Sequence, residues 1–497
     1  MRSIWLLALV LVVGAASLGG EVATARLLAP WFGDSTLIWA NTIATVLLAL
    51  SCGYRLGGHL ADRRPTRRRL AALVLAAACL FALVPFAARP FLRHTVEAFQ
   101  LLSVGTFVGS LLAVLALVAL PMLLLGTVAP FALRLAFTRI EDAGTVAGRL
   151  YAISTVGSLA GVFLSALLLV PFAGTRRTFL VFALALALVA VASLERRWAL
   201  APLAIGALLA LPVGTLKAAP DGRVIWERET PYEYARVVET PDGERRLELN
   251  EGFAVHSVYR PGAWLTGGYW DEPAVAPLAV RAGAPRSVAM LGDAAGTTAR
   301  IYGHYFPRTR VDGVELDGAL HDVGRRLFDL HGPRLHLHTS DARVFLERSE
   351  RRWDAIVVDV YHQPYVPFQL ATREFFALAR ERLTADGVLL MDVAHPPGSD
   401  TLERALSATI GDVFAHVMRD PVGPYNTVLL AAEAPISTRR LLHAARSAPR
   451  DLRPLARAAA RRLAPALTGG EVLTDDRAPV EWLTDASLLE AIAEGDG

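Results

Sequence analysis

Acidic residues stand at the ends of successive strand-like segments in the second half of the chain. In chain order they are Asp293, Glu315, Asp341 and Asp359. The carboxyl ends of parallel strands all lie at one edge of a sheet, and ligands bind beyond that edge. These side chains are therefore expected to lie together. Any one of them could be only a helix N-cap. Four at one edge instead indicate a pocket for a nucleoside, whose hydroxyl and amino groups donate hydrogen bonds to carboxylates.

The turn after the first of these strands is rich in small residues. It reads Gly292-Asp293-Ala294-Ala295-Gly296 and opens a predicted helix. Small residues there let a ligand approach the backbone N–H groups at the helix N-terminus. Glu315 follows Gly296 by 19 residues, the position from which an acid reaches ribose hydroxyls in Rossmann-like folds.

Alternating strand and helix patterns position these residues. Strands are predicted at Ser287–Leu291, Arg310–Leu316, Leu335–Thr339, Ala355–Val360 and Val388–Val393, with helices between them. The alternation predicts a parallel, doubly wound α/β sheet. A small sheet before it, an apolar helix and a closing hairpin are predicted from local patterns: Tyr234–Thr240, Arg245–Asn250 and Phe253–Tyr259; Glu272–Ala282; Val413–Met418 and Thr427–Ala432.

The first 217 residues are suited to a bilayer instead. A membrane-spanning helix needs about 20 mostly apolar residues. Seven stretches reach that length with their flanks: 4–29, 37–59, 70–88, 103–133, 146–172, 178–195 and 198–216. We therefore expect an α-helical transmembrane bundle of about seven spans, with an uncleaved first span, in a multi-pass protein of the cell membrane.

Arginines are unevenly divided between the ends of these spans. Eleven lie at the N-terminus and the even-numbered loops and four at the odd-numbered loops, which favours a cytoplasmic N-terminus. Seven spans would then place the second half of the chain outside the cytoplasm, an awkward place for an enzyme that uses a cytosolic nucleotide-like substrate. The side of the membrane therefore stays open.

Composition excludes several function classes. The two cysteines, Cys52 and Cys79, lie in predicted spans, so neither a disulfide framework nor a CxxC metal site is predicted. The sequence has no P-loop, zinc pattern or nucleic-acid motif. The domains expected are a transmembrane helical domain at 1–217, a small β-strand subdomain at 218–270, a Rossmann-like domain at 271–435 and a C-terminal helical cap at 436–497.

Five short motifs, in this order, resemble the spermidine synthase family of aminopropyltransferases. They are Thr230–Glu233 (S-x-Y-Q in the family), Leu249–Gly252 (L-D-G), Val314–Asp317 (V-E-I-D), Ser340–Arg343 (G-D-A) and the strand Trp353–Asp359. The resemblance covers about residues 225–435. The whole chain resembles, more loosely, the membrane form of this family that is fused to a major-facilitator-like helical half. Gly58–Arg64 is similar to the G-x-L-A-D-R loop of that superfamily.

The resemblance implies a fold, a reaction and a set of site residues. The fold is the S-adenosylmethionine-type methyltransferase fold. The reaction moves an aminopropyl group from decarboxylated S-adenosylmethionine (or another S-adenosylmethionine-type donor) to an amine, with Asp359 as the base and neither a tightly bound cofactor nor a metal. The donor-binding residues implied are Gly292, Asp293, Gly296, Glu315 and Asp341, and the residues implied to line the substrate pocket are Tyr232, Glu233, His256, His362 and Tyr425.

Three positions depart from the family pattern. Ala295 stands where the family has an acid that holds the aminopropyl amine, His362 where it has a second acid, and Glu233 where it has glutamine. Two other functions therefore stay open: a polyamine transporter or sensor with a non-catalytic nucleoside-binding domain, and an S-adenosylmethionine-dependent methyltransferase. The partners expected are a small-molecule amine and the lipid bilayer, with no nucleic acid and a homodimer left open.

Overall fold

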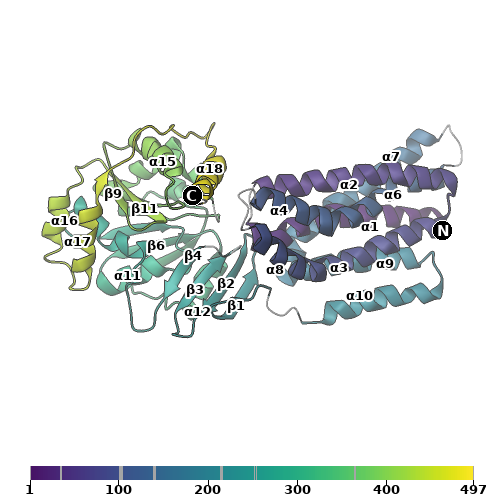
Figure 1. Ribbon diagram of the computed structural model, residues 1–497, viewed down its shortest axis with the longest axis horizontal. Coiled ribbons are helices and arrows are strands. Elements are labelled where there is room, and N and C mark those ends of the chain that lie inside the picture. Colours follow the sequence, from purple (N-terminus) through teal and green to yellow (C-terminus); the bar gives the residue numbers. More distant parts are fainter. Residues whose placement is uncertain are drawn as a thin grey trace. The chain divides into compact units, whose positions relative to one another are not determined.

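The computed structural model describes residues 2–33, 36–99, 105–137, 142–212, 216–250, 252, 254–362 and 365–495. Contacts divide the chain into two compact units, drawn in Figure 1. The first is Met1–Ala218 with Glu227–Ala235 and Asn250–Gly252, and the second is Ala219–Trp226, Arg236–Leu249 and Phe253–Gly497. The domain limits placed at 217, 270 and 435 stay predictions.

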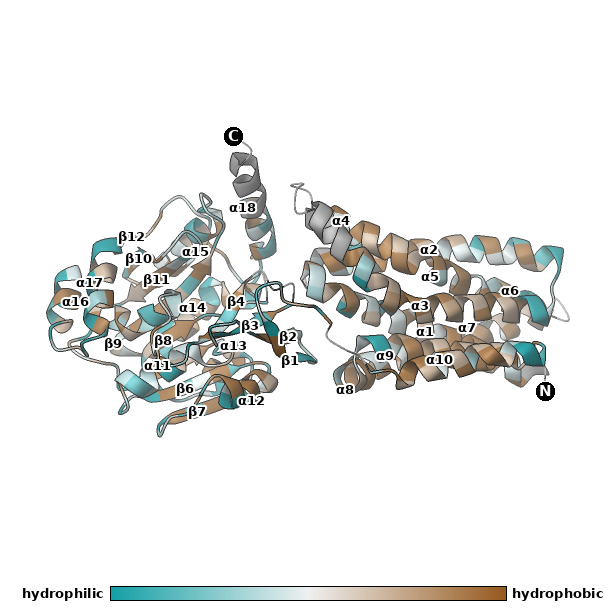
Figure 2. Ribbon diagram, turned by 60° about the horizontal axis from the view of Figure 1, so that its bottom comes forward, coloured by the Kyte–Doolittle hydropathy of each residue, from teal (hydrophilic) through white to brown (hydrophobic). Residues whose placement is uncertain are grey.

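The first unit is helical. Its elements are α1 (Arg2–Phe32), α2 (Thr36–Arg63), α3 (Arg67–Phe99), α4 (Gly105–Val114), the π-helix η1 (Leu115–Ala119), α5 (Leu120–Gly126), α6 (Val128–Ala136), α7 (Ala143–Phe163), the π-helix η2 (Leu164–Leu169), α8 (Val170–Ala173), α9 (Thr175–Val191), the 3₁₀ turn η3 (Arg196–Ala199) and α10 (Leu200–Ala210). Figure 2 shows how apolar residues dominate these helices. Their facing sides form one apolar core that includes Leu9, Phe81, Phe131 and Phe179.

Within the described residues, five helical stretches are long and apolar enough to cross a membrane. They are Ile4–Phe32, Ile38–Arg63, Arg67–Leu92, Val108–Ala136 and Ala143–Ala173. The expected count of seven is not confirmed. The sixth stretch, 178–195, corresponds to α9 of 17 residues, and the seventh, 198–216, to α10 of 11 residues. At about 1.5 Å per residue, α10 covers roughly half of the hydrocarbon thickness. Residues 103–104 of the fourth predicted span and 213–215 of the seventh lie outside the described part of the chain.

A small antiparallel sheet follows. Its strand order is β1 (Arg223–Glu229), β2 (Tyr234–Glu239), β3 (Arg245–Leu249), β4 (Val255–Tyr259). The sequence predicted the last three strands but not β1. Glu251 and Phe253, which belong to the predicted motif and strand there, are outside the described residues.

The second unit is built on an eight-stranded sheet of order β12-β10-β11-β9-β8-β5-β6-β7. The strands are β5 (Ser287–Leu291), β6 (Arg310–Glu315), β7 (Leu335–Thr339), β8 (Trp353–Val358), β9 (Leu383–Ala394), β10 (His416–Pro421), β11 (Asn426–Ala432) and β12 (Ala464–Pro465). Strands β5 to β9 pair in parallel, whereas β10, β11 and β12 are antiparallel to their neighbours. The predicted Rossmann-like, methyltransferase-type sheet is confirmed. Its strand order reverses at β5, between β6 and β8, where such sheets bind ligands.

Helices cover both faces of this sheet. They are α11 (Thr297–Tyr305), α12 (Gly318–Leu327), α13 (Ala342–Arg348), α14 (Arg373–Glu381), α15 (Thr401–Gly411), α16 (Thr438–Ala444), α17 (Leu452–Arg462) and α18 (Val480–Gly495), with the 3₁₀ turn η6 at Phe368–Leu370. Val358 and Met391 belong to the core shared with α13, α14 and α15. Val357 and Leu390 belong to the core shared with α11, α16 and α17. Successive residues of one strand thus serve opposite cores, as the pleat requires.

Two predicted elements need correction. The expected helix Glu272–Ala282 is instead a pair of 3₁₀ turns, η4 (Tyr269–Ala274) and η5 (Ala276–Ala279). Pro273 and Pro277 lie inside them, and each proline removes an N–H that a regular α-helix needs. The first strand of the closing hairpin is β10, which begins at His416 rather than at Val413, because residues 412–413 still belong to the turn after α15.

Candidate functional site

The turn after β5 is shaped by left-handed backbone conformations. Gly292, Ala294 and Gly296 have φ angles of 82°, 47° and 84°. A Cβ atom at Gly292 would overlap the backbone carbonyl of Asp359, and one at Gly296 would overlap the side chain of Leu330. The two glycines therefore permit a close approach between the β5 turn, the end of β8 and the loop that contains Leu330.

Glu315, the last residue of β6, is tied to this turn. Its Oε2 accepts a hydrogen bond from the Ala294 amide at 2.9 Å, and its Oε1 accepts one from the Asp317 amide at 3.0 Å. Burial raises the pKa of Glu315, and these two backbone bonds oppose the rise. Each oxygen keeps a second lone pair, so the carboxylate can still accept hydrogen bonds from neighbouring hydroxyl groups of a ligand.

Strand β4 is fastened to the same turn. The Ala295 amide donates to Ser257 Oγ at 3.0 Å, and the Val258 amide donates to Thr297 Oγ1 at 2.8 Å. These bonds hold the preceding residue of β4, His256, beside the turn. Ala295 itself is fully buried, so its small side chain belongs to the packing beneath the site.

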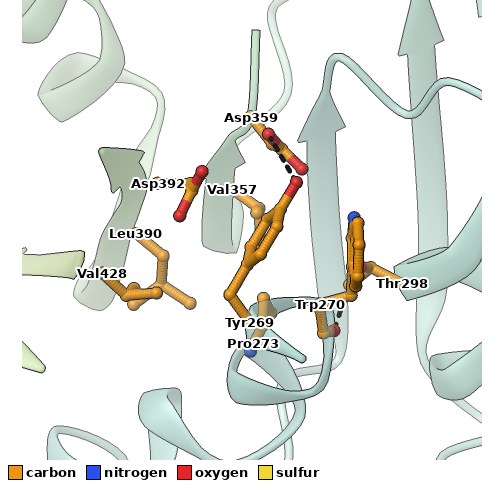
Figure 3. A pocket seen from close by; sticks show the side chains of 9 residues that line it. All are labelled: Tyr269, Trp270, Pro273, Thr298, Val357, Asp359, Leu390, Asp392 and Val428. Carbon is orange, nitrogen blue, oxygen red and sulfur yellow. Dashed lines mark hydrogen bonds between the residues drawn. The ribbon is translucent and has the colours of Figure 1, made fainter. Parts of the chain in front are cut away.

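Two adjoining hollows lie at this edge of the sheet. The first is drawn in Figure 3 and is lined by Tyr269, Trp270, Pro273, Thr298, Val357, Asp359, Leu390, Asp392 and Val428. The second is lined by His256, Trp270, Met290, Leu291, Gly292, Asp293, Thr297, Thr298, Val357 and Asp359. Asp359 lines both hollows, and among the described residues it is the only carboxylate that they share.

Asp359 follows directly on β8, at the junction of the hollows. Its amide donates to the Leu291 carbonyl at 2.9 Å, and the Tyr269 hydroxyl donates to its Oδ1 at 3.5 Å. Burial raises the pKa of Asp359 to about 7; the Tyr269 hydrogen bond opposes this rise, and the carboxylates of Asp293 and Glu315 add to it. A carboxylate with a pKa near neutrality can take a proton and release it again, as a general base must.

The structure brings some of the predicted site residues together. Gly292, Asp293, His256 and Asp359 line the second hollow. Glu315 does not line it but is bonded to the amide of Ala294, the residue after Asp293. Their assignment to donor binding or catalysis stays a prediction.

Other predicted residues line neither hollow. Asp341 caps α13, because its Oδ1 accepts from the Val344 amide at 3.0 Å. The His362 backbone pairs with Tyr365. Tyr232 and Tyr425 are 41% and 60% exposed, and Glu233 is buried. A role for these five residues in the site likewise stays a prediction.

Four polar residues that line the first hollow were missed by the sequence reasoning: Tyr269, Trp270, Thr298 and Asp392. One of them had a usable signal. Asp392 is the acid near the end of the fifth predicted strand, Val388–Val393, and the rule that singled out the four earlier acids applies to it as well. Tyr269 and Trp270 had none, because they lie before a segment that was expected to be a plain apolar helix.

Comparisons with known proteins point to one family for this part of the chain. Residues 276–425 match the profile of the family described as the spermine/spermidine synthase domain. A probable polyamine aminopropyl transferase of Bifidobacterium longum is 34% identical over 226 residues, 45% of this chain and 47% of that protein. A polyamine aminopropyltransferase of Vibrio vulnificus is 30% identical over 136 residues, 26% of this chain and 44% of that protein. The chain thus spans less than half the length of either relative.

Among solved structures, a probable spermidine synthase from Corynebacterium glutamicum superposes with a TM-score of 0.37 at 20% identity. The match covers 51% of this chain and 98% of that one. The family match over 276–425 includes the β5 turn, Glu315, Asp341, Asp359 and Asp392.

Proposed function

We propose that this protein is a membrane-anchored transferase that moves an aminopropyl group from decarboxylated S-adenosylmethionine to an amine. The observation that carries the proposal is the position of Asp359, at the junction of two hollows and with a pKa of about 7. A transfer between two substrates needs two binding spaces that meet at the reacting atoms, and a base at that point. The match to the spermine/spermidine synthase family supports the same reaction.

The donor is assigned to the second hollow. Glu315, which is bonded to the β5 turn, offers acceptors for ribose hydroxyls. Asp341 lies outside the lining of the hollow, and its carboxylate oxygen that does not cap α13 can accept a hydrogen bond from the adenine amino group. His256 lies in the wall of the same hollow. Small residues at 292–296 let the nucleoside approach the helix N-terminus.

The reaction needs one proton acceptor. An alkylammonium has no lone pair, so Asp359 first takes a proton from the acceptor nitrogen. The lone pair then attacks the methylene carbon next to the donor's sulfonium. A C–N bond forms, the C–S bond breaks, and its electron pair stays on sulfur, which leaves as the neutral thioether methylthioadenosine. The sulfonium itself provides the leaving group, so no nucleophilic side chain takes part.

The anchoring is assigned to the first unit. Five stretches in it are long and apolar enough to span a bilayer, and the chain continues from them into the small sheet. The proposal therefore includes a multi-pass protein of the cell membrane. A membrane fraction that retains the protein after an alkaline carbonate wash supports this assignment, whereas release into the supernatant contradicts it.

The test of the reaction compares donors on the purified full chain in detergent. Labelled decarboxylated and intact S-adenosylmethionine are supplied side by side with 1,4-diaminobutane. Transfer of the aminopropyl group alone supports the proposal, whereas transfer of a methyl group indicates a methyltransferase. Methylthioadenosine binding is measured by calorimetry. Asp359→Asn is expected to bind methylthioadenosine and to lose turnover; a protein that binds no methylthioadenosine contradicts the proposal.

A further inference from the structure

The register of β8 and β9 places two carboxylates side by side. Val358 of β8 pairs with Met391 of β9. Continued by one residue, this parallel register brings Asp359 next to Asp392, with the two backbones about 4.8 Å apart, the usual spacing of neighbouring strands. Their side chains point to the face that also carries Val357 and Leu390, and all four line the first hollow. Figure 3 shows both carboxylates beside the Tyr269 phenol.

Asp392 is buried with little to compensate its charge. It is 5% exposed. The side-chain amide of Asn426 on β11 donates to its carboxylate, at 3.1 Å from Oδ1 and 3.0 Å from Oδ2. Burial, together with the charge of Asp359, raises the pKa of Asp392 well above its usual range. Two neighbouring buried carboxylates cannot both ionise without a cation, so a positive charge placed between them would be bound strongly.

The rest of the first hollow suits the carbon chain of such a cation. Leu390, Val428 and Pro273 form apolar walls. Trp270 is one of the residues that line both hollows, and its buried Nε1 has no hydrogen-bond partner within the described part of the chain. An unsatisfied buried N–H is costly, and here it marks the boundary between the hollows as a surface that a bound molecule completes.

We propose that Asp392 binds the acceptor: its carboxylate and that of Asp359 hold the attacking ammonium nitrogen between them, and the alkyl chain lies against Leu390, Val428 and Pro273. This rests on the proposed function and adds the acceptor site to it. Asp359, which also lines the donor hollow, takes the proton, while Asp392 keeps the nitrogen in place. The substrate class that fits is a short primary alkylamine, positively charged and without a carboxylate, which the two acids would repel.

The experiment measures the steady-state kinetics of Asp392→Asn with 1,4-diaminobutane and decarboxylated S-adenosylmethionine. Loss of one charge-assisted contact is expected to raise the KM for the amine about 10- to 100-fold, with a much smaller change in the KM for the donor. Methylthioadenosine affinity, measured by calorimetry, is expected to stay within about twofold. Asp322→Asn, which removes an exposed carboxylate on α12, is the control and leaves every constant unchanged.

The outcomes separate this inference from the proposed function. Wild-type protein without transfer or methylthioadenosine binding contradicts the proposed function itself. An active wild type together with an unchanged amine KM in Asp392→Asn overturns only the acceptor assignment. If Asp392→Asn loses methylthioadenosine affinity, its fold is disturbed and Asp392→Glu decides instead. That variant keeps the charge but moves it by one methylene, so the amine KM rises if the site is correct and an unchanged KM overturns it.

Discussion

Gly292 and Asp359 are in such close contact that the glycine has no room for a side chain. A Cβ atom at residue 292 would overlap the carbonyl group of Asp359, and the φ angle of Gly292 is 82°. The adjacent Leu291 carbonyl accepts a hydrogen bond from the Asp359 amide at 2.9 Å. The turn that would hold the donor and the residue that would act as base are therefore one rigid piece of backbone.

Gly292→Ala should disrupt the contact between the β5 turn and the backbone of Asp359. We expect a loss of about 2–4 kcal/mol in unfolding free energy, from the left-handed φ angle and the overlap together, and a loss of methylthioadenosine affinity. Thermal unfolding and calorimetry provide the measurements. Gly411→Ala is the control, because a Cβ atom at that glycine meets nothing within 4 Å. Normal ligand affinity in Gly292→Ala would contradict the close-contact geometry.

Turnover should depend on the ionisation of Asp359. Its pKa of about 7 means that the base is protonated, and idle, at lower pH. We expect kcat/KM to fall about tenfold per pH unit below 7 and to level off above it. The profile is measured between pH 5.5 and 8.5 with a saturating donor. A profile that stays flat over this range, as an ordinary aspartate with a pKa of about 4 would give, would show that this carboxylate is not the base.

Asp359→Asn should stabilise the protein at high pH. The folded-state pKa lies above the unfolded value of about 4, so between about pH 4 and 7 the folded state holds more protons, and stability is lost as the pH rises through this window. The amide has no such penalty. We expect the unfolding free energy of Asp359→Asn to exceed that of the wild type by about 2–4 kcal/mol at pH 8 and by much less at pH 5. Calorimetric unfolding of both proteins at the two pH values tests this, and an equal gain at both would count against it.

Glu315→Gln should weaken nucleoside binding. Each oxygen of the Glu315 carboxylate accepts a hydrogen bond from a backbone amide. A glutamine side chain has only one acceptor oxygen, so its NH₂ group would face the second backbone amide. We expect methylthioadenosine affinity to fall about 10- to 100-fold. Glu350→Gln, at an exposed position after α13, is the matched control. Unchanged affinity in Glu315→Gln would remove Glu315 from the donor site.

The fold class could be predicted from the sequence alone because the patterns that indicate it are local. The apolar stretches before residue 217 and the alternating strands from Ser287 onward follow from periodicity within a few turns or a few residues. The acids at strand ends pointed to one edge of the sheet, since all parallel strands finish there. The same local rule applies to Asp392, which was not among the predicted site residues.

Local patterns were less reliable where single residues, such as prolines, or the length of a helix determined the secondary structure. Prolines at 273 and 277 divide an apolar segment into 3₁₀ turns, although its hydrophobicity suggested a helix. The last apolar stretch before residue 217 contains a helix of only 11 residues. In both places the composition suited a long helix, whereas the helical elements there are short.

Local patterns in the amino-acid sequence suffice to predict a membrane-type helical half followed by a doubly wound sheet with acids at its edge. Which of these acids meet depends on the folded chain. Asp359 and Asp392 are neighbours because of the register between β8 and β9, and the phenol of Tyr269 reaches Asp359 from a segment 90 residues away in the chain. Such contacts depend on how strands align and how turns pack, and no periodicity along the chain records them.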